Sequence, residues 1–416
     1  MIGNPPWVTN AEIGSLNGDN LPKKSNFKGM RGIEALTGRS NFDLAEFILL
    51  KIIAECEGEN ALIAFLCKTA VARSVLVHAQ RTGLRISDCE IRRIDAKKWF
   101  SASADACLFI LELGCSTPSY QAAVYSSLQA NHPERIMAVV DGNLIADMET
   151  YESIAMLDGS CPIQWRQGVK HDAAPVLELI HVDNEWRNGL GETIDVEDCF
   201  IYPLMKGSDI GGAGGPTQRE RGVILTQCAL GEDTHDLEVS APRLWSYLMR
   251  HRGVFARRRS SIYRGKPPFS IFGVGPYSFS SYKVLVSGLH KEPRFMAVGR
   301  QHGKPILCDD TCYLLPCESG LQCALISTLL NHSLTRQFLE SISFQDSKRP
   351  MTKAILSRID ISALASLLSW EDILEDLECT LSRIGEATDV EPWFSSDLTS
   401  ALSLPNSPDQ ELLFTR

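Results

Sequence analysis

The spacing of hydrophobic residues in the first part of the chain alternates between helix-like and strand-like patterns. Apolar residues after Asp43 lie on one broad helical face, and Glu46 three residues later is typical of a capped helix start. Four further segments follow: an apolar run at 61–66, a helical pattern at 76–81, a strand-like alternation at 89–94 and a second apolar run at 107–113. Helices that alternate with buried strands predict an α/β fold, and this order is compatible with half of a doubly wound sheet.

The pattern changes after residue 115. Residues 116–349 contain short strand-like segments, frequent Gly and Pro and many aromatic residues, whereas 361–369 and 373–384 return to helical spacing. We therefore expect three regions: a partial doubly wound α/β sheet in residues 1–118, a mixed α+β domain in residues 119–349, and a short acidic helical segment in residues 350–416.

The composition is that of a globular chain with a buried core. A length of 416 residues allows two or three domains, and 44% of the residues are hydrophobic against 22% charged. No apolar run approaches the ~18 residues of a membrane helix. Residues 1–10 lack the basic and apolar pattern of a secretory signal, so we expect a cytoplasmic protein that does not bind membranes.

The cysteines favour reduced thiols over disulfides. Their number, 13, is odd, and it is small for so long a chain. The densest cluster is Cys308, Cys312, Cys317 and Cys323, whose gaps match neither CxxC pairs nor a Cys/His zinc site. We expect no metal centre.

Charge is distributed unevenly along the chain. The net charge is -10, yet residues 241–306 contain thirteen Lys or Arg and a single acid, Glu292. From Glu371 to the C-terminus the chain has eleven acids and two arginines. This segregation is what a nucleic-acid-binding surface backed by an acidic remainder would produce.

The clearest chemical signal is the tetrapeptide Asn4, Pro5, Pro6 and Trp7. Consecutive prolines stiffen the backbone, so the side-chain oxygen of Asn4 and the carbonyl of Pro5 can both be aimed at one point. Two such acceptors suit an exocyclic NH2 group, and Trp7 offers a flat face for an extruded base. A simple turn near a chain terminus would use the same residues, so the motif alone leaves both interpretations open.

The motif and the segments after it resemble the DNA amino-methyltransferases that act on adenine N6 and use the motif (D/N/S)PP(Y/F/W). In that family a helix, a strand and a later aromatic residue follow the motif, and Phe100 matches the second stacking aromatic. A core Phe at a strand entrance is the alternative for Phe100. The resemblance implies transfer of a methyl group from S-adenosylmethionine to an adenine flipped out of double-stranded DNA. It makes Asn4 to Trp7 the catalytic motif and Phe100 a substrate contact.

Later blocks resemble the target-recognition region of large restriction-modification methyltransferases. They are WRQGVKHD (165–172), YPLMKGSD (202–209), SSIYRGK (260–266), FSIFGVGPYSFSSYK (269–283) and DDTCY (309–313). The residues expected to contact DNA are Arg166, Lys170, Arg257, Arg258, Arg259, Arg264, Lys266 and Lys283, each of which also suits an ordinary solvated surface. Asp309 and Asp310 lack a following Glu-x-Lys signature, so we expect loop carboxylates rather than a nuclease centre.

One departure from the family concerns the cofactor. Its members bind S-adenosylmethionine through an FxGxG turn placed before the NPPW-type motif, and this chain begins three residues before the motif. A permuted arrangement would have to use Phe272–Gly275, which Pro276 follows instead of a helix start. We therefore expect no cofactor-binding residues here, and a second polypeptide that carries the FxGxG half.

Two functions follow from these expectations. The first is site-specific DNA adenine N6-methylation in a restriction-modification system, by an enzyme that is inactive without its cofactor-binding half. The second is a non-catalytic DNA-binding specificity subunit of such a system.

Overall fold

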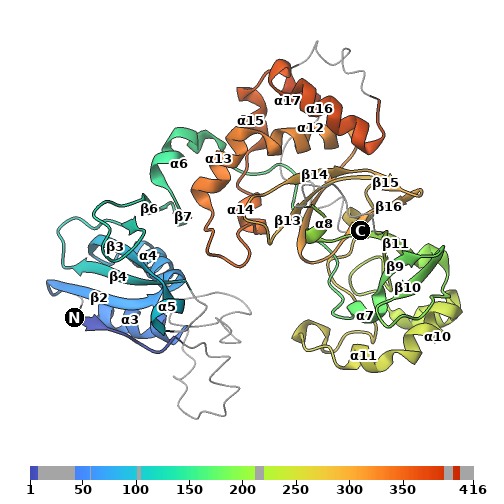
Figure 1. Cartoon of the computed structure of the whole chain (residues 1–416), viewed down its shortest axis with the longest axis horizontal. Coiled ribbons are helices and arrows are strands. Elements are labelled where there is room, and N and C mark those ends of the chain that lie inside the picture. The colour runs from blue at the N-terminus through green and yellow to red at the C-terminus, as the bar shows by residue number, and fades with distance from the viewer. Residues whose placement is uncertain (8–42, 57, 101–104, 211–219, 388–396, 403–416) are drawn as a thin grey trace. The chain divides into compact units, whose positions relative to one another are not determined.

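The computed structural model describes residues 1–7, 43–56, 58–100, 105–210, 220–387 and 397–402 (Figure 1). The chain forms two compact units. The first contains residues 1–153 together with 340–346, and the second contains residues 154–339 and those from 347 onward. Within the described part, no helix has the length and apolar character needed to cross a membrane.

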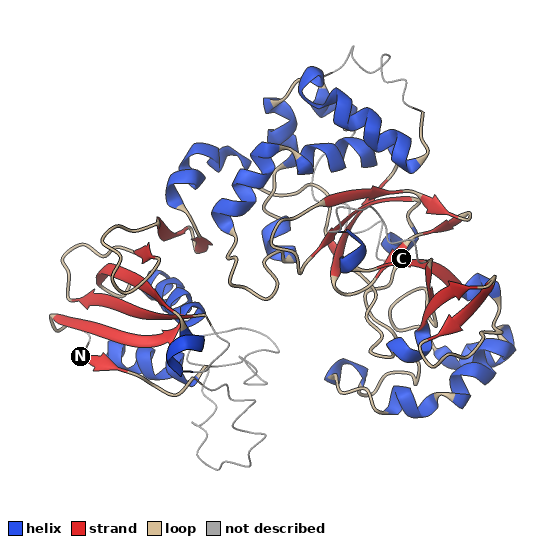
Figure 2. Cartoon of the chain, in the orientation of Figure 1, coloured by secondary structure: helices blue, strands red, loops and turns tan. Residues whose placement is uncertain are grey.

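The first unit is built on a seven-stranded mixed sheet (Figure 2). The strand order is β1-β2-β4-β3-β5-β6-β7, in which β1 is parallel to β2, β3 is parallel to β5, and the other neighbours are antiparallel. The elements in chain order are β1 (Ile2–Gly3), α3 (Leu44–Glu55), β2 (Ala61–Lys68), α4 (Thr69–Thr82), β3 (Ile86–Ile94), α5 (Ala96–Phe100), β4 (Ala106–Leu113), β5 (Gln121–Tyr125), β6 (Arg135–Val140), β7 (Asn143–Ile145) and α6 (Met148–Ile154). The predicted α/β fold is confirmed.

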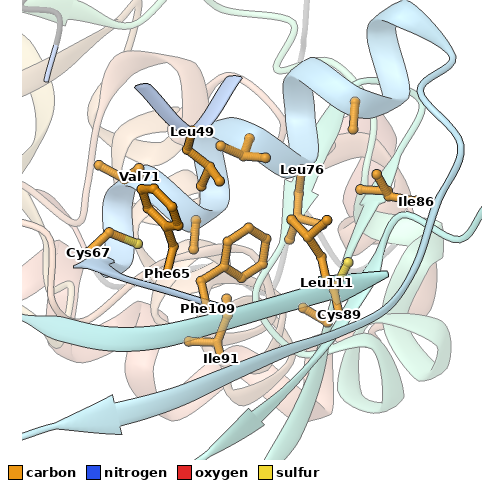
Figure 3. Packing of buried hydrophobic residues seen from close by; sticks show 14 of the residues in the cluster. Leu49, Phe65, Cys67, Val71, Leu76, Ile86, Cys89, Ile91, Phe109 and Leu111 are labelled. Carbon is orange, nitrogen blue, oxygen red and sulfur yellow. The ribbon is translucent and has the colours of Figure 1, made fainter. Parts of the chain in front are cut away.

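Helices α3 and α4 close a hydrophobic core over this sheet (Figure 3). Leu49 of α3, Leu76 of α4 and Phe109 of β4 are all fully buried. Burying each such side chain contributes about 1.5–3 kcal/mol, so the core holds the helices on the sheet. Asp43 caps α3 as predicted, because its side chain accepts a hydrogen bond from the Ala45 amide at 3.1 Å.

The domain boundary expected at residue 118 falls inside this sheet. Strands β5, β6 and β7 extend the sheet beyond β3, because residues 122–125 pair in parallel with residues 89–92. Residues 121–145 carry the same alternating pattern as the strands that follow them, so no sequence pattern indicates that they extend the first sheet.

A late segment, residues 340–346, also belongs to the first unit. Arg73 of α4 donates to both carboxylate oxygens of Asp346, at 2.7 and 2.8 Å, and Thr69 donates a further hydrogen bond. The Arg73 guanidinium also lies 4.4 Å from the centre of the Phe344 ring. Burial by itself would raise the pKa of Asp346, but the hydrogen bonds and charge of Arg73 hold that pKa below its usual value.

Asp346→Asn is expected to destabilise the chain by roughly 1.5–3 kcal/mol at neutral pH, because it leaves a charged, partly buried partner unpaired. A carboxyl group whose pKa is lower in the folded than in the unfolded state stabilises the fold at pH values above its unfolded-state pKa. This stabilisation is lost as the pH falls through the folded-state pKa. The gap from the wild type in urea unfolding should therefore shrink at about pH 3. Asp141→Asn, at an exposed turn, is the control. If Asp346→Asn lost the same stability at neutral pH and at about pH 3, the stabilising role of the Asp346 carboxylate would be contradicted.

The second unit contains three small sheets. The strand orders are β10-β9-β12-β11-β17, β14-β13-β18-β8 and β15-β16. Every neighbouring pair is antiparallel except β11 with β17. The strands are β8 (Arg166–Gln167), β9 (Glu178–Val182), β10 (Glu185–Asn188), β11 (Ile201–Met205), β12 (Arg221–Ile224), β13 (Tyr282–Ser287), β14 (Phe295–Val298), β15 (Arg300–Gln301), β16 (Lys304–Pro305), β17 (Leu307–Cys308) and β18 (Cys312–Cys317).

Helices are more numerous in this unit than the sequence pattern predicted. The α-helices are α7 (Ala174–Leu177), α8 (Gly207–Ile210), α9 (Leu237–Ser240), α10 (Pro242–Arg250), α11 (Arg252–Ala256), α12 (Gly320–Asn331), α13 (Ser333–Ile342, which ends in the first unit), α14 (Lys353–Leu356), α15 (Ile361–Leu367), α16 (Trp370–Ile384) and α17 (Leu398–Ala401). Short 3-10 helices are η1 (Ala155–Leu157), η2 (Asp198–Phe200), η3 (Thr234–Asp236), η4 (Ser261–Tyr263) and η5 (Pro276–Phe279).

The acidic helical segment expected at 350–416 is part of the second unit rather than a separate region. Helix α16 packs against α12, which in turn lies on β13, β14 and β18. Its apolar face includes Ile373, Leu377 and Leu381, all buried. The acidic residues of α16 therefore lie on a helix that covers part of the core of this unit.

Candidate functional site

The tetrapeptide Asn4 to Trp7 directly follows β1, the edge strand of the first sheet. Ile2 and Gly3 of β1 pair in parallel with Ala64 and Phe65 of β2. Parallel strands place their carboxyl ends at the same edge of a sheet, which is where ligands bind in open α/β sheets. Asn4 and Pro6 are exposed, Pro5 is buried and Trp7 is partly buried.

Trp7 is fixed in place by both the sheet and a second aromatic residue. Its indole Nε1 donates a hydrogen bond to the Leu66 carbonyl of β2 at 3.2 Å. Its ring meets the Phe100 ring edge to face, with the ring centres 5.5 Å apart and the planes at 64°. Phe100 ends helix α5 and is 46% exposed, so it is not a core residue. The structure thus brings together two aromatics that lie 93 positions apart, beside the exposed Asn4.

Gly3 allows β1 to pass over a buried ring. A Cβ atom at this position would lie 2.5 Å from the Phe65 ring, well inside contact distance. Phe65 is itself 3% exposed and belongs to the core of the first unit. Any side chain at Gly3 would therefore push β1 away from β2 and displace the tetrapeptide that follows.

The glycine turn at Phe272–Gly275 does not fit a cofactor-binding site. Gly273 has φ +68°, and a Cβ there would lie 2.2 Å from the Gly168 carbonyl oxygen. Phe272 forms an isolated antiparallel bridge with Lys170, and the turn leads into the 3-10 helix η5 rather than an α-helix. Gly273 therefore serves close backbone packing against Gly168, and Gly275 leaves room for the Tyr277 ring.

The predicted DNA-binding residues include exposed side chains and side chains that are bonded within the protein. Arg257, Arg259, Arg264 and Lys266 are exposed. Arg258 is only partly exposed, and its guanidinium donates to the carbonyls of Phe255, His171, Ser270 and Pro268. It also lies 3.7 Å from the centre of the Tyr263 ring, and burial lowers its pKa. Arg258 therefore holds the local chain together instead of extending into solvent.

Lys283 requires a correction, because the structure does not place it on the surface. It is 1% exposed in the middle of β13, and its Nζ donates to the Ile306 carbonyl at 2.8 Å. Burial lowers its pKa to about 8. The neighbouring basic residues suggested a surface position, but strand β13 is covered on both faces, so we leave Lys283 out of any DNA contact.

Arg166 and Lys170 both have partners within the second unit. Arg166, on strand β8, lies over the Tyr277 ring at 5.0 Å. Lys170 forms ion pairs with Asp172 at 2.9 Å and with Asp310 at 3.3 Å. Burial would lower the pKa of Lys170, but these two carboxylates raise it. Asp310 is thus part of an ion-pair cluster.

The described residues contain no group of three His, Cys, Asp or Glu side chains arranged to hold a metal ion. Asp309 instead accepts hydrogen bonds from the backbone amide and hydroxyl of Thr311. All thirteen cysteines are free thiols, and burial raises the pKa of Cys89 to about 12. The carboxylates at 309–310 therefore act as structural groups in their loop.

Sequence reasoning missed one basic residue beside this surface. Arg252 begins helix α11, is exposed, and lines a cavity together with Arg259, Arg264 and Lys266. The same basic segment contained it, but it stands alone in sequence, whereas Arg257, Arg258 and Arg259 form a run next to the block at 260–266. Helix α11 ends at Ala256, so the turns after it, and not a shared helix face, bring Arg252 and Arg259 to the same cavity.

Comparisons with known proteins identify structures and a sequence that are similar to this chain. No protein-family model matches the chain. A solved structure of the type IIL restriction-modification enzyme MmeI in complex with DNA is similar, with a TM-score of 0.53 and 14% identity over 99% of this chain. The chain spans about half of that enzyme, 55% of its length. A DrdV–DNA complex gives a TM-score of 0.44 at 10% identity, covering 90% of this chain and 44% of that one.

The MmeI likeness shows the fold of a restriction-modification enzyme. In sequence, the chain is 38% identical over 371 residues to the type II methyltransferase M.NspV of Nostoc sp. (strain ATCC 29411 / PCC 7524), covering 88% of this chain and 76% of that protein. The chain therefore belongs to the type II methyltransferases.

Proposed function

We propose that this protein is a site-specific DNA adenine N6-methyltransferase of a restriction-modification system that uses S-adenosylmethionine as methyl donor. Its relative is a type II methyltransferase, and the MmeI structure is a complex with DNA. The single observation that carries the adenine assignment is the contact between Trp7 and Phe100 beside Asn4. Two aromatic rings next to paired acceptors suit a flat base that bears an amino group.

The proposed chemistry uses hydrogen-bond acceptors rather than a nucleophile. The Asn4 side-chain oxygen and the Pro5 carbonyl accept hydrogen bonds from the amino group of a flipped adenine. Acceptors held at that point orient the nitrogen and favour the positive charge that develops on it during methylation. The prolines supply the rigidity, since a pyrrolidine ring fixes φ at both positions. Trp7 and Phe100 hold the plane of the base.

The cofactor is proposed to be held by a second polypeptide that carries the FxGxG half. Strand β1 has β2 as its one neighbour among the described strands, and Ile2 is 87% exposed. Beside it, Met1, Phe47, Ile48 and Ile52 line an apolar hollow of about 230 Å³ on helix α3. An open strand edge next to an apolar helix face favours packing against a further strand and helix.

The deciding experiment measures methyl transfer from labelled S-adenosylmethionine to duplex DNA, with this chain alone and together with a candidate FxGxG polypeptide. We expect transfer in the mixture, and N6-methyladenine as the product. A product methylated at cytosine would refute the adenine assignment. Transfer by the chain alone would refute the need for a second polypeptide.

The alternative is a DNA-binding specificity subunit in which the same pocket is present but unused. The observation that favours it is the poor fit of the glycine turn at Phe272–Gly275 to a cofactor. In that case the assembly would methylate normally after substitution of Asn4.

Trp7→Ala is expected to weaken both base flipping and turnover, because stacking acts on the bound base before the chemical step. Loss of one aromatic stacking contact costs about 1–3 kcal/mol, or roughly five- to 150-fold. A 2-aminopurine at the target position would report flipping by its fluorescence. Trp7→Phe should restore part of both effects, since it keeps a ring but loses the bond to Leu66. If Trp7→Ala gave the same 2-aminopurine fluorescence as the wild type, the flipped base would not stack on Trp7.

A further inference from the structure

The second unit contains a cavity of about 800 Å³ with a strongly basic lining, which we call the basic cavity. Its volume falls in the range of about 300–1,000 Å³ that is usual for ligand sites. Its lining has five cationic side chains and no acidic one. These cations are Arg252, Arg258, Arg259, Arg264 and Lys266. Arg252 lies on α11, and the other four lie on the turns before and after η4.

The wall of the basic cavity is rigid because Arg258 braces it. This guanidinium donates to four backbone carbonyls, and its carbon lies 5.1 Å from the centre of the Phe255 ring and 3.7 Å from that of the Tyr263 ring. Phe269, 1% exposed, meets Phe255 edge to face at 5.0 Å. The other four cations are thus carried by a segment whose backbone is tied to a packed aromatic cluster.

The four remaining cations, Arg252, Arg259, Arg264 and Lys266, lack carboxylate partners within the described part of the chain. Elsewhere in the same unit arginines are paired: Arg243 binds Asp195 at 2.7 Å, and Arg358 binds Asp158. Unpaired like charges around one cavity repel each other. An anion bound among them would relieve that repulsion, so the arrangement favours an anionic ligand.

We propose that the basic cavity binds consecutive phosphates of the DNA backbone, with Arg252, Arg259, Arg264 and Lys266 as the contacts and Arg258 as the brace. This inference rests on the proposed action on DNA. A phosphodiester strand supplies several negative charges in a row, as four separate cations require, and phosphate contacts position a protein on DNA without reading its sequence. Arg257, although exposed, does not line the cavity and is not included.

The test measures binding of the chain to a random-sequence duplex by fluorescence anisotropy over a series of salt concentrations. The double variant Arg259→Gln/Arg264→Gln should lower the slope of log K against log salt by about 1.8, that is about 0.9 for each lost phosphate contact. Arg294→Gln is the matched control, because Arg294 is exposed in the same unit but outside the cavity. Its slope should equal that of the wild type.

Two results would overturn the inference in distinguishable ways. If the wild type binds DNA and the double variant has the same salt slope as Arg294→Gln, the DNA backbone does not contact the basic cavity. That result would leave the proposed function intact. Absence of wild-type binding would count against both proposals. In that case, calorimetric titration with inorganic tripolyphosphate decides whether the cavity instead binds a soluble phosphate compound. A heat of binding that the wild type shows and the double variant lacks would assign the cavity to such a compound.

Discussion

Asn4→Ala is expected to reduce methyl transfer by a hundredfold or more, while DNA affinity changes by no more than a few-fold. Asn4 is exposed at the carboxyl end of β1, and its side chain makes no hydrogen bond with another described residue that would be lost on substitution. Loss of one positioned hydrogen-bonding group at a reacting centre costs on the order of 2.7–4 kcal/mol of transition-state stabilisation. Affinity should persist because it comes mainly from phosphate contacts.

The measurement needs the complete assembly, with single-turnover transfer and anisotropy recorded on the same preparation. Asn143→Ala is the control, since Asn143 is exposed on β7 at the opposite edge of the same sheet, with five strands between β7 and β1. It should leave both quantities unchanged. If Asn4→Ala retains near-normal turnover, the tetrapeptide is not the catalytic pocket and the specificity-subunit alternative replaces our proposal.

Gly273→Ala is expected to destabilise the second unit by at least about 1–3 kcal/mol, the cost of a non-glycine residue in an unfavourable backbone region. The residue has φ +68°, and the new Cβ would lie 2.2 Å from the carbonyl oxygen of Gly168, a backbone atom that cannot rotate away. Repulsion therefore adds to the strain. The melting temperature and urea midpoint should both fall.

The matched control is Gly253→Ala in helix α11, where a Cβ would meet nothing within 4 Å. Alanine in a helix should be neutral or stabilise by about 0.5–1 kcal/mol. The pair also tests the permuted cofactor hypothesis. Normal stability of Gly273→Ala, together with a loss of affinity for S-adenosylmethionine, would assign the turn to the cofactor and refute its structural role.

Helices α3 and α4 and strands β2, β3 and β4 of the first unit could be predicted because their apolar patterns are regular. Asp43 marks the start of α3, and the apolar runs at 61–66 and 107–113 correspond to β2 and β4. Helix α12 was missed for the opposite reason. It is buried on nearly every side, as Leu325, Ile326 and Leu329 illustrate, so its sequence has no polar face and no helical period.

The pairing of Trp7 with Phe100 was expected from the family resemblance and not from spacing, since nothing local connects two residues so far apart. Burial of individual cations could not be predicted either. Lys283 and Arg264 look alike in a basic stretch, but one lies within a strand of a covered sheet and the other on an exposed turn. Only tertiary packing distinguishes them, because a charged side chain carries no pattern that indicates its depth.

The return of residues 340–346 to the first unit affects how the protein emerges during synthesis. Arg73 and Asp346 lie 273 residues apart. At about 5–20 residues per second, the ribosome would deliver Asp346 roughly 14–55 s after Arg73. Throughout that interval the nascent first unit lacks Phe344 and the carboxylate that neutralises Arg73. Its final closure must therefore wait until residues 154–339 of the second unit have been translated, while residues 347 onward are still to come.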